Sequence, residues 1–198
     1  ALLVEKNTSG LSFGNNEEKM GWKSQPTAQV IFDDCHVSSK KLLGEENKGF
    51  IYAMQGLDGG RLNIAAAALG GAQAALNIAK KYIKERKAFG KSLSEFQGLQ
   101  FKVADMEIAI NSSRTFLREA AWKLDNAKSD AAVYCAMAKK FVTDNSFNIA
   151  NNSLQLLGGY GYLADYGIEK IVRDLRVHQI LEGTNEIMQL LVARDSLK

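Results

Sequence analysis

The sequence predicts a mainly α-helical protein, in which a short β segment precedes a bundle of three long helices and two short ones. Three observations support this fold class. Pro26 is the only proline in 198 residues, and proline interrupts helices. From about position 47 onwards, apolar residues recur at spacings of three, four or seven, as they do on one face of a helix. Glycines and short apolar runs instead punctuate the first 33 residues or so, which is typical of strands and turns.

The β segment contains two apolar runs, Leu2–Val4 and Gln29–Phe32, and a connecting loop follows near Asp33. The sequence begins at Ala1, within an apolar run that reads as a strand entered partway. This run is too short for a signal peptide, and no basic residues precede it. We therefore expect a fragment or a processed chain.

The expected helices run from about 47 to 90, 92 to 125, 129 to 157, 165 to 175 and 184 to 196. Basic residues and Gly90 suit the C-terminus of the first helix. Ser92 and Glu95 form an S-x-x-E capping box at the start of the second. Thr184 is placed to cap the last helix. No internal repeat or low-complexity segment interrupts this order.

Composition excludes several classes of function. The net charge of +3 is too small to indicate a nucleic-acid-binding protein. No run of about 18 uninterrupted apolar residues is present, so we expect no membrane span. Cys35 and Cys135 are far apart, with no CxxC pair or neighbouring histidine cluster. We expect neither a metal site nor a disulfide framework, and a reducing compartment fits better.

The helical pattern is broken at Asp58, Gly59, Gly60 and Arg61, inside the first long helix. Each glycine in a helix interior costs about 1 kcal/mol relative to alanine. The pair therefore serves either close helix packing, which the residues alone slightly favour, or the passage of a ligand. Arg61 could bind a carboxylate or phosphate, although a salt bridge within the bundle is the commoner role.

Two further segments allow two interpretations each. Gly158, Gly159 and Gly161 follow the third long helix and permit either the approach of a ligand or a simple turn, and we weigh these equally. Arg86 near the end of the first helix suits the helix dipole, with a phosphate contact as the second interpretation.

Glu182 is the candidate general base. It follows the apolar pair Ile180 and Leu181 and directly precedes Gly183, on a loop ahead of the helix that Thr184 caps. Apolar neighbours could desolvate the carboxylate and increase its basicity. The alternative is an ordinary exposed loop glutamate. His178 is better explained as a structural residue than as a catalyst.

Taken together, these segments resemble the acyl-CoA dehydrogenase family over the whole chain. The motifs that carry the resemblance occur in the family's order and spacing: Arg86–Gly90, Phe96-Gln97 with Gln100, Leu157–Gly161 and Glu182–Thr184. Two earlier segments, Glu18–Trp22 and Phe32–Cys35, resemble the end of the family's middle β-domain. The resemblance implies that residues 1–40 end that β-domain and form the connecting loop, and that residues 41–198 form its C-terminal helical bundle.

Within the family, four segments resemble the branch that oxidises isobutyryl-CoA in valine breakdown: Gly10–Gly14, Gly21–Thr27, Gly59–Arg61 and Val177–Gly183. Glu182 matches the family's catalytic glutamate. Some members place the base instead at the position that Gly60 holds here, so a glycine at 60 agrees with a glutamate at 182.

The resemblance also implies the remaining site residues. Matches to FAD contacts are Arg86, Phe96, Gln97, Gln155, Leu156, Leu157, Gly158, Gly159, Thr184, Asn185 and Glu186. Matches to the acyl-CoA site are Asp58, Gly59, Gly60, Arg61, Gly183 and Arg194. In the family, the contacts at Arg86, Phe96 and Gln97 reach a neighbouring subunit.

The implied activity is FAD-dependent α,β-dehydrogenation of a short branched acyl-CoA. Glu182 takes the α-proton, and the β-hydride passes to the flavin. The implied partners are electron-transfer flavoprotein and, in a homotetramer, further copies of the chain. The implied location is the mitochondrial matrix, or the cytoplasm in a bacterium.

Three alternatives remain open: another short-chain or methyl-branched acyl-CoA dehydrogenase, an acyl-CoA oxidase, and a catalytically inert helical oligomerisation module. Because much of the family's flavin site lies in strands outside these 198 residues, we expect this chain alone to bind FAD poorly and to catalyse little.

Overall fold

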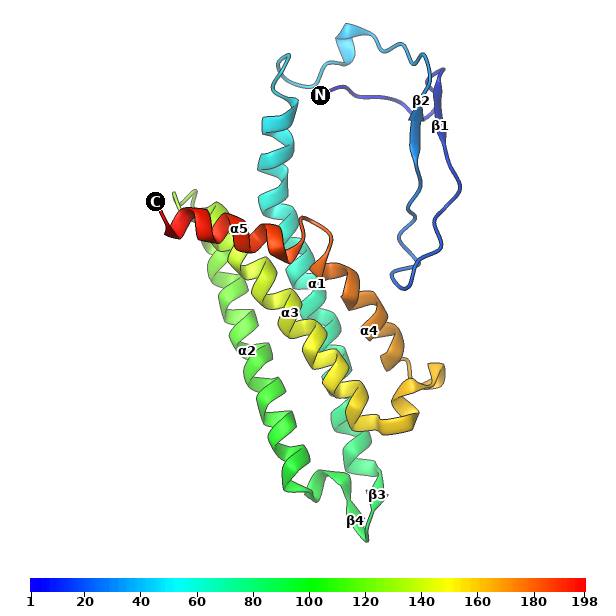
Figure 1. Cartoon of the computed structure of the whole chain (residues 1–198), viewed down its shortest axis with the longest axis vertical. Coiled ribbons are helices and arrows are strands. Elements are labelled where there is room, and N and C mark those ends of the chain that lie inside the picture. Colours follow the sequence, from blue (N-terminus) through cyan, green and yellow to red (C-terminus); the bar gives the residue numbers. More distant parts are fainter. The chain divides into compact units, whose positions relative to one another are not determined.

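The computed structural model describes all 198 residues, and it confirms the mainly α-helical fold class. The chain divides into two compact units, Ala1–Leu57 and Asp58–Lys198. The longest helix, α1 (Gly49–Glu85), begins in the first unit and continues through the second (Figure 1). Each unit is described separately below.

The first unit contains a small antiparallel sheet. Strand β1 (Leu11–Phe13) pairs with β2 (Val30–Phe32), so that Leu11 lies opposite Phe32. The apolar run at Leu2 forms only an isolated bridge with Leu42 and not a strand. All three residues of β2 are exposed, and a two-stranded sheet has too little surface to bury an apolar face by itself.

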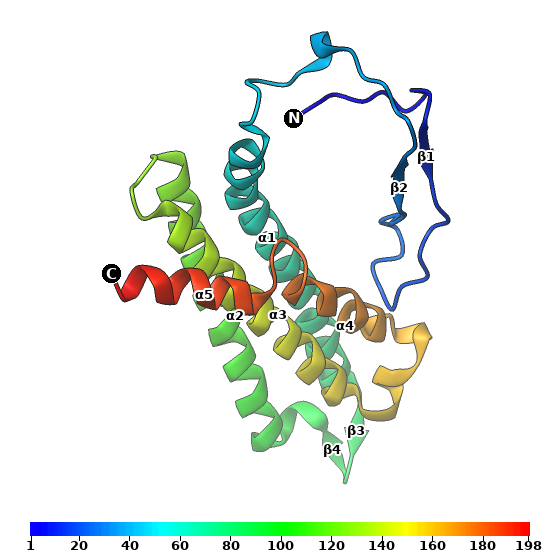
Figure 2. The same cartoon turned by 45° about the horizontal axis from the view of Figure 1, so that its top comes forward.

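The second unit is a helical bundle centred on α3 (Ala131–Leu157). Helix α2 (Gln97–Asp125) packs along α3, and the short helices α4 (Ile168–Arg176) and α5 (Asn185–Ser196) both pack against α3 as well. The two views of the chain show α2, α3 and the C-terminal part of α1 side by side, with α5 crossing α3 (Figures 1 and 2). The predicted helices from α2 to α5 are confirmed, with ends within three residues of the expected ones, except that α2 begins at Gln97, five residues after the expected start.

The core of the bundle is built on small residues of α1. Ala65, Ala68 and Ala72 have no exposed surface, so neighbouring helices approach the α1 backbone closely. By length and composition alone α1 could also cross a membrane, since an 18-residue window has a mean hydropathy of 1.3. The core helix of a helical bundle meets the same criterion, and the buried alanines place α1 in that class.

The connection between α1 and α2 differs from the prediction. Helix α1 ends at Glu85, and Lys87–Ala88 (β3) pairs with Lys91–Ser92 (β4) in a small hairpin. Phe89 and Gly90 at its tip have φ angles of 51° and 81°. Two consecutive residues with positive φ are the signature of a type I′ hairpin turn, so Gly90 serves this turn rather than the end of the helix.

Ser92 links the end of α1 to the start of α2. Its backbone amide donates to Oε1 of Glu95 at 2.7 Å, which completes the predicted capping box around a short 3₁₀ turn, Leu93–Glu95. Its hydroxyl lies 2.9 Å from the carbonyl oxygen of Ile83 and 3.1 Å from that of Lys84. One side chain therefore satisfies open backbone groups at two helix ends.

We expect Ser92→Ala to lower the free energy of unfolding by about 1–2 kcal/mol, because cap removal typically costs this much. Chemical denaturation followed by far-ultraviolet circular dichroism measures the change. Ser112→Ala, at an exposed position within α2, is the matched control and should change stability by less than about 0.5 kcal/mol. Equal denaturation midpoints for the two variants would contradict the capping role of Ser92.

Candidate active site

Glu182 lies on a short loop between two helical segments. Helix α4 is followed by a 3₁₀ turn, Val177–Gln179, and α5 begins at Asn185. Thr184 is the N-cap of α5, and its hydroxyl oxygen accepts a hydrogen bond from the amide of Ile187 at 3.4 Å, which confirms the predicted cap. Glu182 therefore lies immediately before the N-terminus of α5.

The backbone of this loop is in an uncommon conformation. Glu182 has a φ of 57° and Gly183 a φ of 85°, both in the left-handed region. A left-handed conformation is uncommon for a residue other than glycine and is stable only where the surroundings fix it. Ile180, one of the apolar neighbours expected to shield the carboxylate, is 50% exposed and provides little shielding.

The carboxylate of Glu182 lies against the backbone of α1 at Gly60. A Cβ atom placed on Gly60 would lie 2.3 Å from Oε2 of Glu182 and 2.9 Å from its Cδ. Any other residue at position 60 would therefore require the carboxylate of Glu182 to move. The glycine in the middle of this helix is therefore explained by the glutamate that contacts it and not by contact with another helix.

The neighbours of Gly60 on α1 have different surroundings. A Cβ atom on Gly59 would meet nothing within 4 Å, so this glycine faces open space. Asp58 and Arg61 form an ion pair of 2.6 Å, with side chains that are 22% and 11% exposed. The Nε of Arg61 is buried and has no hydrogen-bond partner. The segment therefore has open space at Gly59 and one buried, unsatisfied donor at Arg61.

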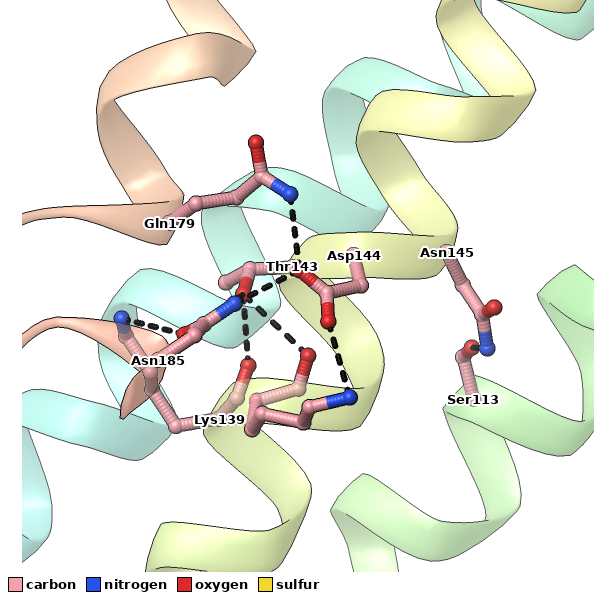
Figure 3. Close-up of polar contacts among 8 residues, drawn as sticks. Ser113, Lys139, Thr143, Asp144, Asn145, Gln179 and Asn185 are labelled. Carbon is pink, nitrogen blue, oxygen red and sulfur yellow. Dashed lines mark hydrogen bonds and ion pairs between the residues drawn. The ribbon is translucent and has the colours of Figure 1, made fainter. Parts of the chain in front are cut away.

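Polar side chains on α3 form hydrogen bonds with the loop and with the start of α5. The sequence analysis did not predict this cluster. Lys139 has no exposed surface, and its Nζ donates to the carbonyl oxygen of Gly183 at 2.8 Å. It also donates to Oδ1 of Asn185 at 2.8 Å (Figure 3). The periodicity of α3 contains the signal: Lys139 stands four residues after Cys135 and three before Val142, both buried. A lysine at this spacing from apolar residues lies on the buried face of the helix, so the sequence indicates a buried lysine here.

The predicted FAD contacts at Thr184–Glu186 have three different environments. The Asn185 side chain is buried, and it donates a hydrogen bond to Asp144 of α3. Glu186 is exposed, and hydrogen bonds from its own backbone amide and from Thr184 lower the pKa of its carboxyl. Thr184 is partly buried and caps α5.

A second group of predicted site residues gathers at the other end of α1. The guanidinium of Arg86 lies over the ring of Tyr160, 5.5 Å from its centroid. Phe96 contacts Phe89 of the hairpin edge-on, and Lys91 lies over its ring at 4.4 Å. Gln97 is exposed at the first position of α2.

The glycine-rich segment after α3 belongs to this second group. Gly158 has a φ of 59°, and neither it nor Gly159 would bring a Cβ atom within 4 Å of another atom. Gly161 instead packs against Leu154, where a Cβ atom would lie 2.5 Å from the carbonyl oxygen. Each of the two interpretations therefore applies to part of the segment. Gly161 is required by the turn, whereas Gly159 leaves open space that a ligand could approach.

The residues before these glycines differ in exposure. Gln155 is exposed, whereas the side chains of Leu156 and Leu157 are in the core at 6% and 3% exposure. Only the backbone of the two leucines could contact a ligand. Arg194 is exposed on α5, about 14 Å along the helix from Asn185 at 1.5 Å per residue, and is not part of either group.

The two groups lie far apart within one chain. From Gly60 to Glu85, α1 rises by about 38 Å at 1.5 Å per residue. The first group contains Glu182, Gly183, Thr184 and Asp58–Arg61, and the second contains Arg86, Phe96, Gln97, Gln155, Gly158 and Gly159.

A family model for the acyl-CoA dehydrogenase C-terminal domain matches residues 47–197. The chain belongs to the acyl-CoA dehydrogenase family. Members of this family are FAD flavoproteins and oxidoreductases that act on CH–CH bonds. The match includes all five α-helices of the structure, from Gly49 to Ser196.

Two curated relatives match over 197 of the 198 residues of this chain. It is 51% identical to the mitochondrial isobutyryl-CoA dehydrogenase of Bos taurus and 52% identical to that of Dictyostelium discoideum. The structure of butyryl-CoA dehydrogenase from Megasphaera elsdenii is 40% identical and superposes with a TM-score of 0.96, over 100% of this chain and 51% of that one. The chain covers 47% of each curated relative, so it spans about half of their length.

Proposed function

We propose that the protein catalyses the FAD-dependent α,β-dehydrogenation of isobutyryl-CoA, with Glu182 as the base. The observation that carries this proposal is the contact between the Glu182 carboxylate and α1 at Gly60. The next residue, Gly59, faces open space, and we expect the acyl thioester to lie there. The identity of 51–52% to two isobutyryl-CoA dehydrogenases supports the substrate.

The chemistry requires a base and a hydride acceptor. The Glu182 carboxylate takes the α-proton of the thioester, and the electron pair of that C–H bond forms the new C=C bond as the β-hydrogen leaves as hydride. FAD, when bound, accepts the hydride and its two electrons. Hydrogen bonds to the thioester carbonyl stabilise the developing negative charge, and we propose that the backbone amide of Glu182 supplies one of them.

The residues at the far end of α1 fit a cofactor that carries phosphates. Arg86 is an exposed cation beside Tyr160, and Gly158 and Gly159 leave open space that no side chain of this chain fills. We propose that Arg86, Phe96, Gln97 and the backbone of Gln155–Gly159 hold the adenine and phosphate part of FAD, and that Thr184 and Glu186 contact the remainder.

We propose a homo-oligomer, with four copies as in the family resemblance. The rise of about 38 Å along α1 supports this assembly, because one cofactor molecule cannot span both groups of a single chain. A second copy would complete each site with its own Arg86 group. The molar mass of the flavin-containing protein, measured by light scattering, tests the stoichiometry.

The remaining proposals follow from the family. Electron-transfer flavoprotein is the proposed electron acceptor, and isobutyryl-CoA is the proposed acyl-CoA substrate. Residues 1–40 are proposed to end the middle β-domain, and residues 41–198 to form the C-terminal bundle. The two mitochondrial relatives support the mitochondrial matrix as the location, with the cytoplasm as its counterpart in a bacterium.

The decisive experiment uses the full-length protein without oxygen. We expect its visible flavin band to bleach when isobutyryl-CoA is added, and to return when an electron acceptor is supplied. Faster bleaching by butyryl-CoA would assign the protein to the straight-chain branch. Consumption of oxygen in step with product would indicate an oxidase. A flavin band that no acyl-CoA bleaches would refute the dehydrogenase proposal.

A further inference from the structure

Lys139 is a buried lysine whose ammonium group contacts the loop of Glu182 and the first residue of α5. It lies in the middle of α3 with no exposed surface. A charged group is costly to bury unless it is paired or fully hydrogen-bonded. Burial lowers the pKa of Lys139 to about 8, and the carboxylates of Asp144 and Glu186 partly oppose this shift. At neutral pH the group is therefore mainly an ammonium ion.

The hydrogen bonds of Lys139 are directed at the two residues that follow the candidate base. Its Nζ donates to the carbonyl oxygen of Gly183 and to Oδ1 of Asn185, at 2.8 Å each. Figure 3 shows Lys139 on α3 and Asn185 at the start of α5 facing each other. The first bond fixes the peptide that directly follows the left-handed turn.

The same part of α3 also binds the residue that precedes this loop. Asp144 accepts hydrogen bonds from Nε2 of Gln179 and from Nδ2 of Asn185, both at 2.7 Å (Figure 3). Nδ2 of Asn185 also donates to the hydroxyl oxygen of Thr143 at 3.0 Å. Gln179 and Asn185 flank Glu182, so both ends of its loop are attached to α3.

The loop needs such an attachment for two reasons. First, Glu182 and Gly183 both have a positive φ, and a left-handed residue other than glycine costs about 1–2 kcal/mol. Second, no hydrogen bond or ion pair holds the Glu182 carboxylate itself within the 198 residues. The direction of the carboxylate is therefore set by the backbone of its loop.

We propose that Lys139 is a positioning residue, whose bonds to Gly183 and Asn185 hold the loop in the conformation that directs the Glu182 carboxylate at Gly60. It touches neither the acyl group nor the flavin. This inference rests on the proposed function for its effect on turnover, whereas its effect on the loop is independent of any activity.

The test compares Lys139→Met with Lys123→Met in the full-length protein. Methionine keeps an unbranched side chain but removes the charge and the N–H donors. Lys123 is a suitable control because its side chain is 16% exposed and its ion pair with Asp130 joins α2 to the start of α3, away from the loop. Circular dichroism and gel filtration confirm that each variant folds. If Lys139→Met does not fold, Lys139→Gln takes its place.

The first readout is hydrogen exchange of the peptide that spans 177–187. We expect Lys139→Met to accelerate exchange in this segment at least about tenfold and to leave α2 unchanged, because only the loop loses its anchor. Lys123→Met should leave the segment as in the wild type. Wild-type exchange of the loop in Lys139→Met would overturn the proposal, and so would equal acceleration in Lys123→Met.

The second readout separates positioning from general destabilisation. A displacement of a catalytic group by about 1 Å can lower the rate about 100-fold, so we expect Lys139→Met to lower kcat about 100-fold with KM changed less than about threefold. If the wild type is active and Lys139→Met has the same kcat as the wild type, the positioning role is refuted. If the wild type oxidises no acyl-CoA, the proposed function fails, and the exchange measurement still decides whether Lys139 holds the loop.

Discussion

Replacing Glu182 with glutamine in the full-length protein is expected to lower the rate of flavin reduction by isobutyryl-CoA between about 10²-fold and 10⁴-fold. This is the range that a positioned general base contributes. Glutamine has nearly the shape of glutamate, so it fits beside Gly60 and preserves the fold. Its neutral amide cannot accept the α-proton, and the chain offers no other carboxylate in contact with Gly60.

Stopped-flow absorbance of the flavin under anaerobic conditions measures this rate directly. The matched control is Glu119→Gln, at an exposed position on α2, which should reduce the flavin at the wild-type rate. Substrate binding by Glu182→Gln should persist, because the change affects proton transfer and not the volume of the site. Flavin reduction by Glu182→Gln at a rate near that of the wild type would show that another group is the base.

Replacing Gly60 with alanine is expected to lower kcat about 100-fold although it adds only one methyl group. That methyl carbon would lie 2.3 Å from Oε2 of Glu182, so the carboxylate must move by about 1 Å. A displacement of this size is enough to cost about 100-fold in rate. Stability should not fall in parallel, because alanine in a helix interior is favoured over glycine by about 1 kcal/mol.

Gly70→Ala is the control for the change at Gly60. Gly70 lies on the same helix, and a Cβ atom there would meet nothing within 4 Å. This variant should gain up to about 1 kcal/mol of stability and keep its turnover. In a Glu182→Ala background, Gly60→Ala should cause no further loss, because the collision partner is absent. Full activity of Gly60→Ala would mean that the carboxylate does not occupy this position during the reaction.

The helical bundle could be predicted from the sequence because its information is local. The periodicity of apolar residues located α2, α3, α4 and α5, and side-chain caps at Ser92 and Thr184 marked where helices begin. Glu182 could be singled out because it stands between an apolar pair and a glycine. These signals depend on residues within one or two turns of each other.

Other features depended on contacts between distant segments. Phe89 adopts a positive φ in the hairpin turn, and phenylalanine gives no indication of that conformation. A glycine is present at position 60 because the carboxylate of Glu182, 122 positions later in the chain, contacts it. Neither helix propensity nor residue spacing indicates this contact. Lys139 lies among apolar residues of α3, but its acceptors are provided by α5 and the loop before it.

The contact between Gly60 and Glu182 also restricts how this site can evolve. Two carboxylates, one at each position, would claim the same volume and repel each other, whereas a chain with neither would have no base. Exchange of the base between α1 and the loop therefore requires two substitutions, and each single intermediate is either crowded or inactive. The residue pair at 60 and 182 is therefore expected to change together or not at all.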